Sequence, residues 1–293
     1  MPNKGQRSFK LSVQKDDGTT LVIRNPFTLE FTIERNNMSS VNTAEIRIYN
    51  LSKRSRNHIR RDLNDFGVVK KIRLEAGYGD RISTIFQGTI SQGYSTRQGV
   101  NSITTIISKD GGWQAVNSIF SKAFPNGTEK KAIVDDIAAK LAKDGIATGA
   151  IGKVDGKISR GVAVSGSSFD ALRKVIGENF FIDNETLHVL SDSESLKGNI
   201  IVINAKSGLL NTPTLERIFV TFDILLEPKL KVGQRIKLDS NFVDKDINTV
   251  YKIVGVNHKG VISEAVNGAC VTTVKCLPGD FKETDLKTGV EIK

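Results

Sequence analysis

A period-two alternation of apolar and polar residues is the feature that most constrains the fold, and it opens the chain. Phe9, Leu11 and Val13 alternate with polar residues, a turn sequence follows at 16–18, and a second apolar run occupies 21–23. Alternation of this kind places every second side chain on the same face of a β-strand. Asp-Asp-Gly favours a tight turn between two strands. We therefore predict that the chain starts with an antiparallel β-hairpin.

The following segments repeat the alternation, which indicates sheets with one buried face. The expected inward residues of the next two strands are Phe27, Leu29, Phe31, Ile33, Ala44, Ile46 and Ile48. More short strands between glycine-rich turns continue as far as the glycine pair 111–112, and strands return from residue 200. This spacing is typical of a β-barrel or β-sandwich rather than of alternating strands and helices.

Two distant segments share a pattern that suggests an internal repeat. "KKIRLEAG" is followed by the glycine of "FQGTI", Gly88, and "GQRIKLDS" is followed by the glycine of "IVGVN", Gly255. A strand, a loop, a second strand and a glycine thus occur at similar spacing in both places. We predict that the two β-rich regions are copies of one barrel.

Residues 113–192 change in character and favour helices. The apolar stripe expected on the first long helix is Ile133, Ile137 and Leu141. Ser167, with Asp170 three residues later, resembles a capping box at the start of a second helix. A short hairpin with its turn at 183–184 follows that helix. These parts predict a small α+β subdomain inserted between the two β regions.

The expected fold is therefore mainly β with an α+β insert, in which two similar β-barrel domains flank a small helical and hairpin subdomain. The expected divisions are 1–112 for the first barrel, 113–192 for the insert, 193–280 for the second barrel and 281–293 for a charged C-terminal tail.

The composition, with 39% hydrophobic and 25% charged residues, is that of a core-forming protein. No run approaches the roughly 18 apolar residues that span a membrane, and the first ten residues lack the apolar core of a signal peptide. We therefore expect no membrane insertion and synthesis in a cytosol. Cys270 and Cys276 lie six residues apart on one predicted strand, too far for a disulfide, so they are expected to be packed thiols.

The net charge of +10 is unevenly spread, and its densest part follows the fourth predicted strand. The candidate protein-contact residues there are Lys53, Arg54, Arg56, Arg60, Arg61, Lys70, Lys71 and Arg73. Ser52 can cap a short helix over 54–63 that would carry part of this cluster. The cluster could be a solvated face, a surface for an acidic protein or a nucleic-acid interface. The recognition helix, zinc module or aromatic platform that usually accompanies nucleic-acid binding is not visible.

We expect no catalytic residues, no cofactor and no metal. His58, His188 and His258 lie in separate segments without a visible carboxylate partner, and we expect them at exposed or strand-surface positions. No glycine-containing turn has the spacing of a phosphate-binding loop or a nucleophile elbow. The chain is therefore expected not to be an enzyme.

Three stretches resemble the central hub protein of phage tail baseplates, the family of late-control protein D and the contractile-tail hubs. The first is "NPFTLEFTIERNNMSSVNTAEIRIYNLSKRSRNHI", a hairpin followed by "IYNLS" and a basic helix. The second is "SGSSFDALRKVIGENFFIDNETLHVL", the helix and hairpin of the insert. The third is "SGLLNTPTLERIFVTFDILLEPKLKVGQRIKLDS", the entry into the second barrel.

The resemblance implies a structural virion protein of the tail baseplate, synthesised in the host cytoplasm. It implies a homotrimer whose six barrels present pseudo-sixfold symmetry, so that the ring joins the hexameric tail-tube protein to a trimeric spike protein and forms part of the DNA-ejection channel. Further partners would be baseplate wedge and tape-measure proteins, with DNA only as transiting cargo. The chain lacks a lysozyme-like extension, so a separate protein is expected to supply the spike. The basic cluster would then face an acidic neighbour, or else the transiting DNA.

Three other functions stay open at the level of the sequence. A tail-tube or distal-tail structural protein would need one barrel rather than two. A basic nucleic-acid-binding module would bind DNA tightly and lose affinity steeply with salt. A peptidoglycan hydrolase would clear a zymogram and lose that activity on substitution of a single carboxylate.

Overall fold

The computed structural model describes residues 6–14, 18–38, 41–62, 69–240, 249–265 and 268–285, and it confirms a mainly β protein. The first region contains β1 (Arg7–Gln14), β2 (Thr20–Arg24), β3 (Leu29–Asn36), β4 (Thr43–Tyr49), α1 (Lys53–Ile59), β5 (Lys71–Tyr78), β6 (Arg81–Gln98) and β7 (Asn101–Lys109). The middle region contains α2 (Gly112–Asn117), β8 (Ile119–Phe124), α3 (Lys130–Lys143), β9 (Ala147–Ile151), β10 (Val162–Ser167), α4 (Ser168–Ile176), β11 (Phe180–Ile182) and β12 (Thr186–Val189). The last region contains β13 (Glu194–Ile203), β14 (Thr214–Glu216), β15 (Phe219–Leu225), β16 (Gln234–Leu238), β17 (Val250–Ile262), β18 (Cys270–Pro278) and β19 (Lys282–Thr284).

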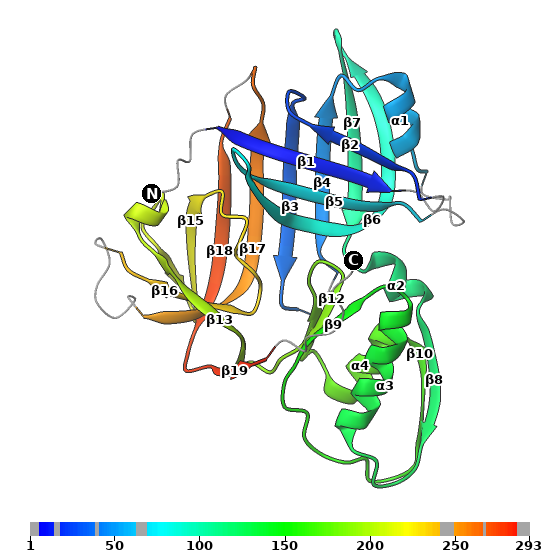
Figure 1. Cartoon of the computed structure of the whole chain (residues 1–293). Helices are drawn as coiled ribbons and strands as arrows, with labels where there is room; N and C mark the ends of the chain where they lie inside the picture. The colour runs from blue at the N-terminus through cyan, green and yellow to red at the C-terminus, as the bar shows by residue number, and fades with distance from the viewer. Residues whose placement is uncertain are drawn as a thin grey trace.

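The strands of the first and last regions form one continuous sheet of 14 strands (Figure 1). Its main path runs β14-β15-β18-β17-β3-β4-β7-β6-β5-β1-β2, and β16, β13 and β19 continue from β17 on a side branch. The two regions meet where β3 pairs with β17 in an antiparallel ladder of eight residue pairs, from Leu29 opposite Ile262 to Asn36 opposite Gly255.

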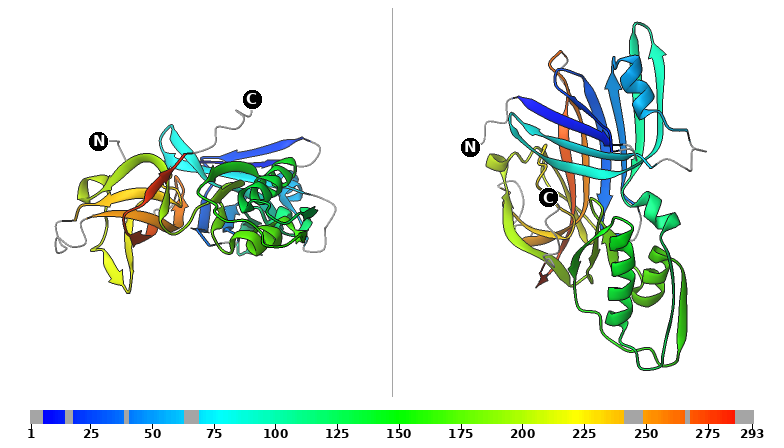
Figure 2. Two further views of the ribbon diagram at one scale, coloured as in Figure 1. Left: turned by 90° about the horizontal axis from the view of Figure 1, so that it is seen from below. Right: turned by 45° about the vertical axis from the view of Figure 1, so that its right-hand side comes forward.

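The expected mainly β class is confirmed, but no closed barrel is found among the described residues. In a closed barrel, β3 at one end of the first region would pair with β2 at the other end. Instead, the edge of β3 that does not pair with β4 pairs with β17. Each region is a strongly curled, open sheet, in which β1 and β5 lie across β3 and β4 (Figures 1 and 2). Because each sheet is curled, the apolar face of its strands on one side packs against the apolar face of its strands on the other side. The core is therefore buried without closure of the sheet through hydrogen bonds.

The two regions nevertheless share one strand order. In the first region the order β3-β4-β7-β6-β5-β1 matches β14-β15-β18-β17-β16-β13 in the last. The two segments compared in the sequence occupy the same place, because "KKIRLEAG" forms β5, "GQRIKLDS" forms β16, and their glycines lie on the next strands, β6 and β17. One difference is that β1 runs antiparallel to β5, whereas β13 runs parallel to β16.

Each region has its own hydrophobic core, as the alternation requires. The first core is built on the expected inward residues of β1, β3 and β4 together with Ile72, Leu74 and Phe86. The last core includes Phe222, Ile236 and Ile253. Phe27 is an exception to the expected pattern, because it lies before β3, outside the strand pairing, and is 38% exposed.

The middle region packs its helices against short strands to form a third core (Figure 1). Ile133, Ile137 and Leu141 are all buried, which confirms the stripe on α3. The Oγ of Ser167 accepts a hydrogen bond from the Asp170 backbone N–H at 3.1 Å, which confirms the cap of α4. The hairpin predicted after α4 is present as β11 and β12.

Three smaller expectations can be compared with the structure. Cys270 and Cys276 are buried free thiols on β18. No helix in the described part of the chain is long and apolar enough to span a membrane. The range 281–293, taken as a tail, contains β19, which pairs with β13, and the residues after 285 lie outside the described chain.

Candidate protein-contact surfaces

The eight basic residues of the sequence cluster do not form one surface. They lie on α1, in the extended segment after it, and on or next to β5, in the order Lys53, Arg54, Arg56; Arg60, Arg61; Lys70, Lys71, Arg73. The strand and the helix present these side chains in different directions. The cluster therefore divides into internal contacts, a side facing the insert, and a groove beside α1.

Helix α1 is shorter than the predicted range 54–63 and ends at Ile59, whose side chain is buried in the first core. The Oγ of Ser52 accepts a hydrogen bond from a backbone N–H three residues later at 3.2 Å, which confirms the predicted cap. The helix ends there because the backbone of Arg61 pairs with Gly93 of β6, with both N–H to O distances at 2.9 Å. Residue 63, the last of the predicted range, lies outside the described residues.

Lys70 and Arg61 form internal contacts and are not part of an open surface. Lys70 is buried, and its Nζ donates to the backbone O of His58 at 3.1 Å and to that of Arg60. The guanidinium of Arg61 donates to the backbone O of Ile90. These contacts hold the end of α1 on the sheet, because the carbonyls at a helix end need donors.

Arg73 and Lys71 face the insert instead of α1. The Nε of Arg73 donates to Gln87 Oε1 at 3.0 Å, and Gln87 Nε2 donates to Glu185 Oε2 at 2.7 Å. The Nζ of Lys71 lies 3.6 Å from where a Cβ would stand on Gly145, in the turn after α3. These two cations therefore belong to the boundary between the sheet and the insert.

Three of the four remaining cations line a groove of about 410 Å³ between α1 and β6, and the fourth, Arg54, is exposed on α1 outside that lining. Its lining residues are Lys53, Arg56, Asn57, Arg60, Asp62, Tyr94 and Ser95. We call this the α1–β6 groove. Three basic side chains and one acidic side chain line the groove, so its lining carries a net positive charge.

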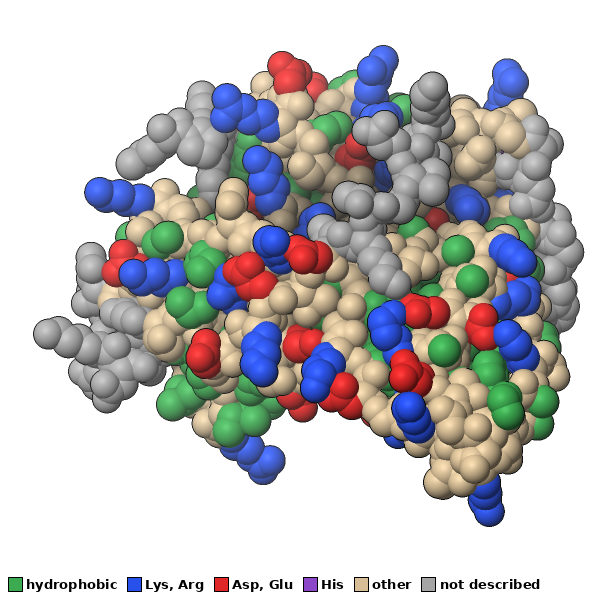
Figure 3. Space-filling model, turned by 60° about the horizontal axis from the view of Figure 1, so that its bottom comes forward, with side chains coloured by type: hydrophobic (Ala, Val, Ile, Leu, Met, Phe, Trp, Pro, Cys, Tyr) green, Lys and Arg blue, Asp and Glu red, His purple; other side chains and the backbone are tan. Residues whose placement is uncertain are grey.

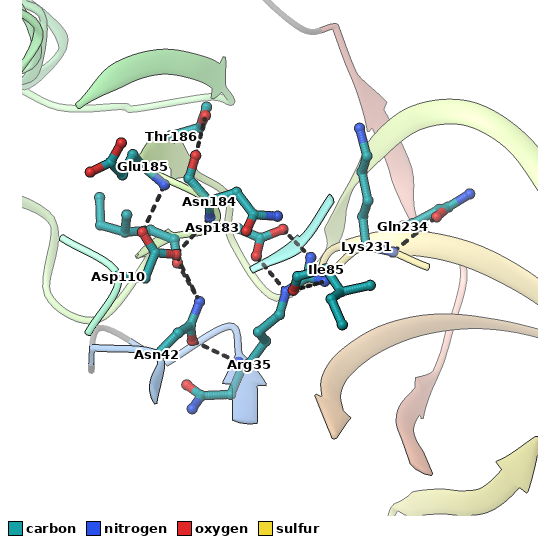
Figure 4. A network of polar contacts seen from close by, with 12 residues as sticks. Arg35, Asn42, Ile85, Asp110, Asp183, Asn184, Glu185, Thr186, Lys231 and Gln234 are labelled. Carbon is teal, nitrogen blue, oxygen red and sulfur yellow. Dashed lines mark hydrogen bonds and ion pairs between the residues drawn. The ribbon is translucent and has the colours of Figure 1, made fainter. Parts of the chain in front are cut away.

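A second polar site, which the sequence reasoning missed, lies between the sheet and the insert (Figure 4). Arg35 on β3 forms a two-point ion pair with Asp183, in which Nε lies 2.7 Å from Oδ1 and Nη2 lies 2.6 Å from Oδ2. Their side chains are 2% and 6% exposed. The sequence held one signal of this site: Arg35 shares its parity with Leu29, Phe31 and Ile33, so a charged residue occupied an inward position of a predicted strand.

Asp110, directly after β7, holds the turn of the insert's hairpin (Figure 4). Its carboxylate accepts hydrogen bonds from the backbone N–H groups of Asn184 at 2.6 Å and Glu185 at 2.7 Å. Those two residues have φ angles of 53° and 56°, a left-handed conformation that non-glycine residues seldom adopt. Asn42 adds a donor to Asp110 at 3.3 Å. The carboxylate thus satisfies a strained turn and fixes the insert to the sheet.

The environment of Asp110 changes its protonation. Burial, the main cause, together with the nearby carboxylates of Asp183 and Glu185, raises the pKa of Asp110 from 3.8 to about 7. Backbone hydrogen bonds to the carboxylate act in the opposite direction but do not offset the burial. The folded protein therefore binds this proton more tightly than the unfolded chain does.

Replacing Asp110 with asparagine should alter how stability depends on pH. Between about pH 4 and pH 7 the unfolded chain releases the proton that the folded protein keeps, so this group's contribution to the free energy of unfolding falls as pH rises and levels off above 7. Relative to Asp110→Asn, the native chain should lose on the order of 2 kcal/mol between pH 5 and pH 8. Urea unfolding of both proteins at several pH values measures this, and parallel curves would contradict it.

Two of the three histidines are not where the sequence placed them, whereas His58 is half-buried on α1, with its Nε2 3.2 Å from the backbone O of Val13. His188 and His258 are buried, although both were expected at exposed or strand-surface positions. Burial lowers the pKa of His188 to about 4 and that of His258 to about 3, so both are neutral near pH 7. The Nδ1 of His188 accepts a hydrogen bond from the Ala150 backbone N–H at 3.1 Å, which is a packing role.

Within the described residues, no group of three or more His, Cys, Asp or Glu side chains is arranged to hold a metal ion. A broader groove of about 630 Å³ runs over the outer face of the β3–β17 ladder and is lined by both acidic and basic residues. Figure 3 likewise shows acidic and basic side chains interspersed over the lower face of the molecule, without a large area of one sign.

Comparison with known proteins gives a match to one family model and several solved structures with a similar fold. The sequence matches the family model of baseplate hub gp41 over residues 8–259. No curated protein sequence gives a match. The 43 kDa tail protein of prophage MuSo2 from Shewanella oneidensis has a similar structure, with a TM-score of 0.60 and 8% identity over 92% of this chain and 96% of that one.

Two further solved structures share the fold. A tail protein from Neisseria meningitidis MC58 has a TM-score of 0.60 and 10% identity, and the match covers 92% of this chain and 96% of the other. The c3393 protein of E. coli, described as a type VI secretion component similar to the T4 phage tail proteins gp27 and gp5, has a TM-score of 0.55 and 10% identity over 87% and 74% of the two chains.

Proposed function

This chain belongs to the baseplate hub gp41 family and is thus a structural component of a phage tail, and from that membership we propose that it acts as a trimeric hub. Three copies would form a ring that joins the hexameric tail-tube protein to a trimeric spike protein and encloses part of the DNA-ejection channel. Baseplate wedge and tape-measure proteins would be further partners. DNA would pass only as cargo, and the protein would be made in the host cytoplasm and reside in the virion.

One observation carries this proposal: the shared strand order of the two β regions. Three copies of a chain with two alike regions place six alike units around one axis, which matches a sixfold partner on one side and a threefold partner on the other. The two β regions can be alike without being closed barrels, because two open curled sheets with the same strand order can offer the same outer strands to a partner.

The ends of the sheet also support assembly with neighbouring copies. β14 and β2 lie at the two ends of the main path, so each has an edge that no described strand covers. Leu215 on β14 and Ile218, two residues after that strand, are 55% and 59% exposed. Uncovered strand edges with exposed apolar side chains favour pairing with another chain. In the hub, we propose that neighbouring subunits cover them.

The proposal predicts the mass of the purified chain. Light scattering should give three times the 32.0 kDa of one subunit for the chain alone, or a larger mass that contains three copies of this chain for its complex with the tail-tube protein of the same phage. A strict monomer that forms no threefold complex with tube or spike proteins would contradict the trimeric hub.

The same sample distinguishes the nucleic-acid alternative, which the charge of +10 motivates. A DNA-binding module would bind duplex DNA tightly at low salt and lose affinity steeply as salt rises. A hub that only encloses a channel should bind DNA weakly at every salt concentration.

A further inference from the structure

The α1–β6 groove lies next to a strand edge that no described strand covers. β5 pairs with β6 only as far as Thr89, whereas β6 continues to Gln98 (Figure 1). Beyond that point β6 has β7 on one side, and on its other side the described backbone partners are Lys70, whose O accepts from the Ile90 N–H at 2.8 Å, and Arg61, at Gly93. The last residues of β6 are therefore an edge with a helix beside it.

The direction of the backbone at this edge follows from the Gly93 bridge. Both the N–H and the C=O of Gly93 point toward Arg61, away from β7. Residues two and four positions later in a strand point the same way, so Ser95 and Arg97 present their N–H and C=O groups outward. No described residue forms a backbone hydrogen bond with either of them. Such an edge can accept an added strand.

The groove beside this edge contains one side-chain nitrogen that lacks an acceptor among the described residues. The Nε of Arg56 is buried and has no hydrogen-bond partner among the described residues. Within the described residues, the guanidinium of Arg60 pairs with Asp62 at 3.4 Å, and both side chains of that pair are 70% exposed. Buried polar atoms in native proteins nearly always have a partner. A carboxylate is the acceptor that best matches a guanidinium, since it can form two parallel hydrogen bonds.

We propose that the α1–β6 groove binds an extended acidic segment of another tail protein. The segment adds to the edge of β6 through the backbone of Ser95 and Arg97, and its carboxylates reach Arg56 and Arg60. This inference rests on the proposed role in tail assembly, because it assigns the acidic neighbour of that role to one surface and one backbone conformation.

Two other occupants fit the groove less well. The β14 edge of a second copy carries Glu216 next to Arg217, so it offers no net negative charge to three cations. A nucleic acid would use stacking platforms, and Tyr94 is the single aromatic residue of the lining. An alternating row of outward N–H and C=O groups matches a peptide backbone rather than a phosphate chain.

A labelled ten-residue peptide of alternating Glu and Thr probes the groove on the full chain by fluorescence anisotropy. We expect it to bind at least about tenfold more tightly than the same peptide with Gln in place of Glu. The double variant Arg56→Glu, Arg60→Glu should weaken binding by roughly tenfold or more. The control Lys206→Glu, Lys229→Glu has the same charge change at exposed positions of the last region and should stay within about twofold.

Methylation of the peptide backbone tests the strand geometry. N-methyl groups on alternate residues block one edge of an extended peptide and leave the other edge intact. One of the two possible registers should abolish binding and the other should retain it. Equal effects of both registers would overturn the proposed strand addition, as would equal binding of the Glu and Gln peptides.

Competition and mass measurements complete the test. A single-stranded oligonucleotide that displaces the peptide with higher affinity would overturn the proposal in favour of nucleic acid. If Arg56→Glu, Arg60→Glu instead converts a trimer to monomers, the groove binds a second copy and the proposal is also overturned. A stable trimer that ignores the peptide leaves the hub role standing and removes only this inference.

Discussion

Replacing Arg35 with alanine is expected to lower the free energy of unfolding by about 3–5 kcal/mol, because it leaves the carboxylate of Asp183 buried without its partner. The carboxylate of Asp110 lies close enough to that of Asp183 for two negative charges to repel each other, which adds to the cost. Trp113, the single tryptophan of the chain, lies on α2 near this junction, and its fluorescence during urea unfolding measures the loss.

Two further variants identify the cause of that loss. Lys131→Ala removes an exposed ion pair with Asp135 and should cost less than about 1 kcal/mol. The double variant Arg35→Met, Asp183→Leu removes both buried charges and should cost less than Arg35→Ala alone. If Arg35→Ala costs no more than Lys131→Ala, the ion pair does not hold the insert to the sheet.

Replacing Phe86 or Phe222 with alanine is expected to lower the free energy of unfolding by about 3–5 kcal/mol each. Both rings are fully buried, Phe86 in the first core and Phe222 in the last. The β3–β17 ladder joins the two regions, so either substitution should weaken both. Hydrogen exchange at the backbone amides of β5 and β16 measures the two regions separately in the same variant.

Phe27→Ala is the matched control for these core substitutions, because this ring is 38% exposed. It should change the free energy of unfolding by no more than about 0.5 kcal/mol. Exchange that rises in one region only would show that the two regions unfold independently, and that the ladder between β3 and β17 does not couple them.

Much of the local structure could be predicted from the sequence. The alternation of apolar residues placed β1, β3 and β4 and identified their inward residues, apart from Phe27. The cap at Ser167 and the stripe on α3 were also correct. These features depend on residues that are close together in the chain, so the order of apolar and polar residues is enough to predict them.

The candidate surfaces were harder to predict, since they depend on how strands from distant segments meet. The basic cluster was found as a stretch of sequence, but Lys70 and Arg61 turned out to be internal and Arg73 faces the insert. The junction of Arg35 with Asp183 joins residues 148 positions apart. No periodicity within either segment encodes such a distance.

Local patterns in the sequence indicated the strands β1, β3 and β4, the helices α3 and α4 with their apolar faces, and the pattern that two regions share. The pairing of β3 with β17 into one sheet, and the set of cations that line the groove beside β6, emerged only from the folded chain. The physical reason is that side-chain periodicity sets burial locally. Strand pairing uses backbone N–H and C=O groups that every residue carries, so the choice of partner depends on how the whole chain packs.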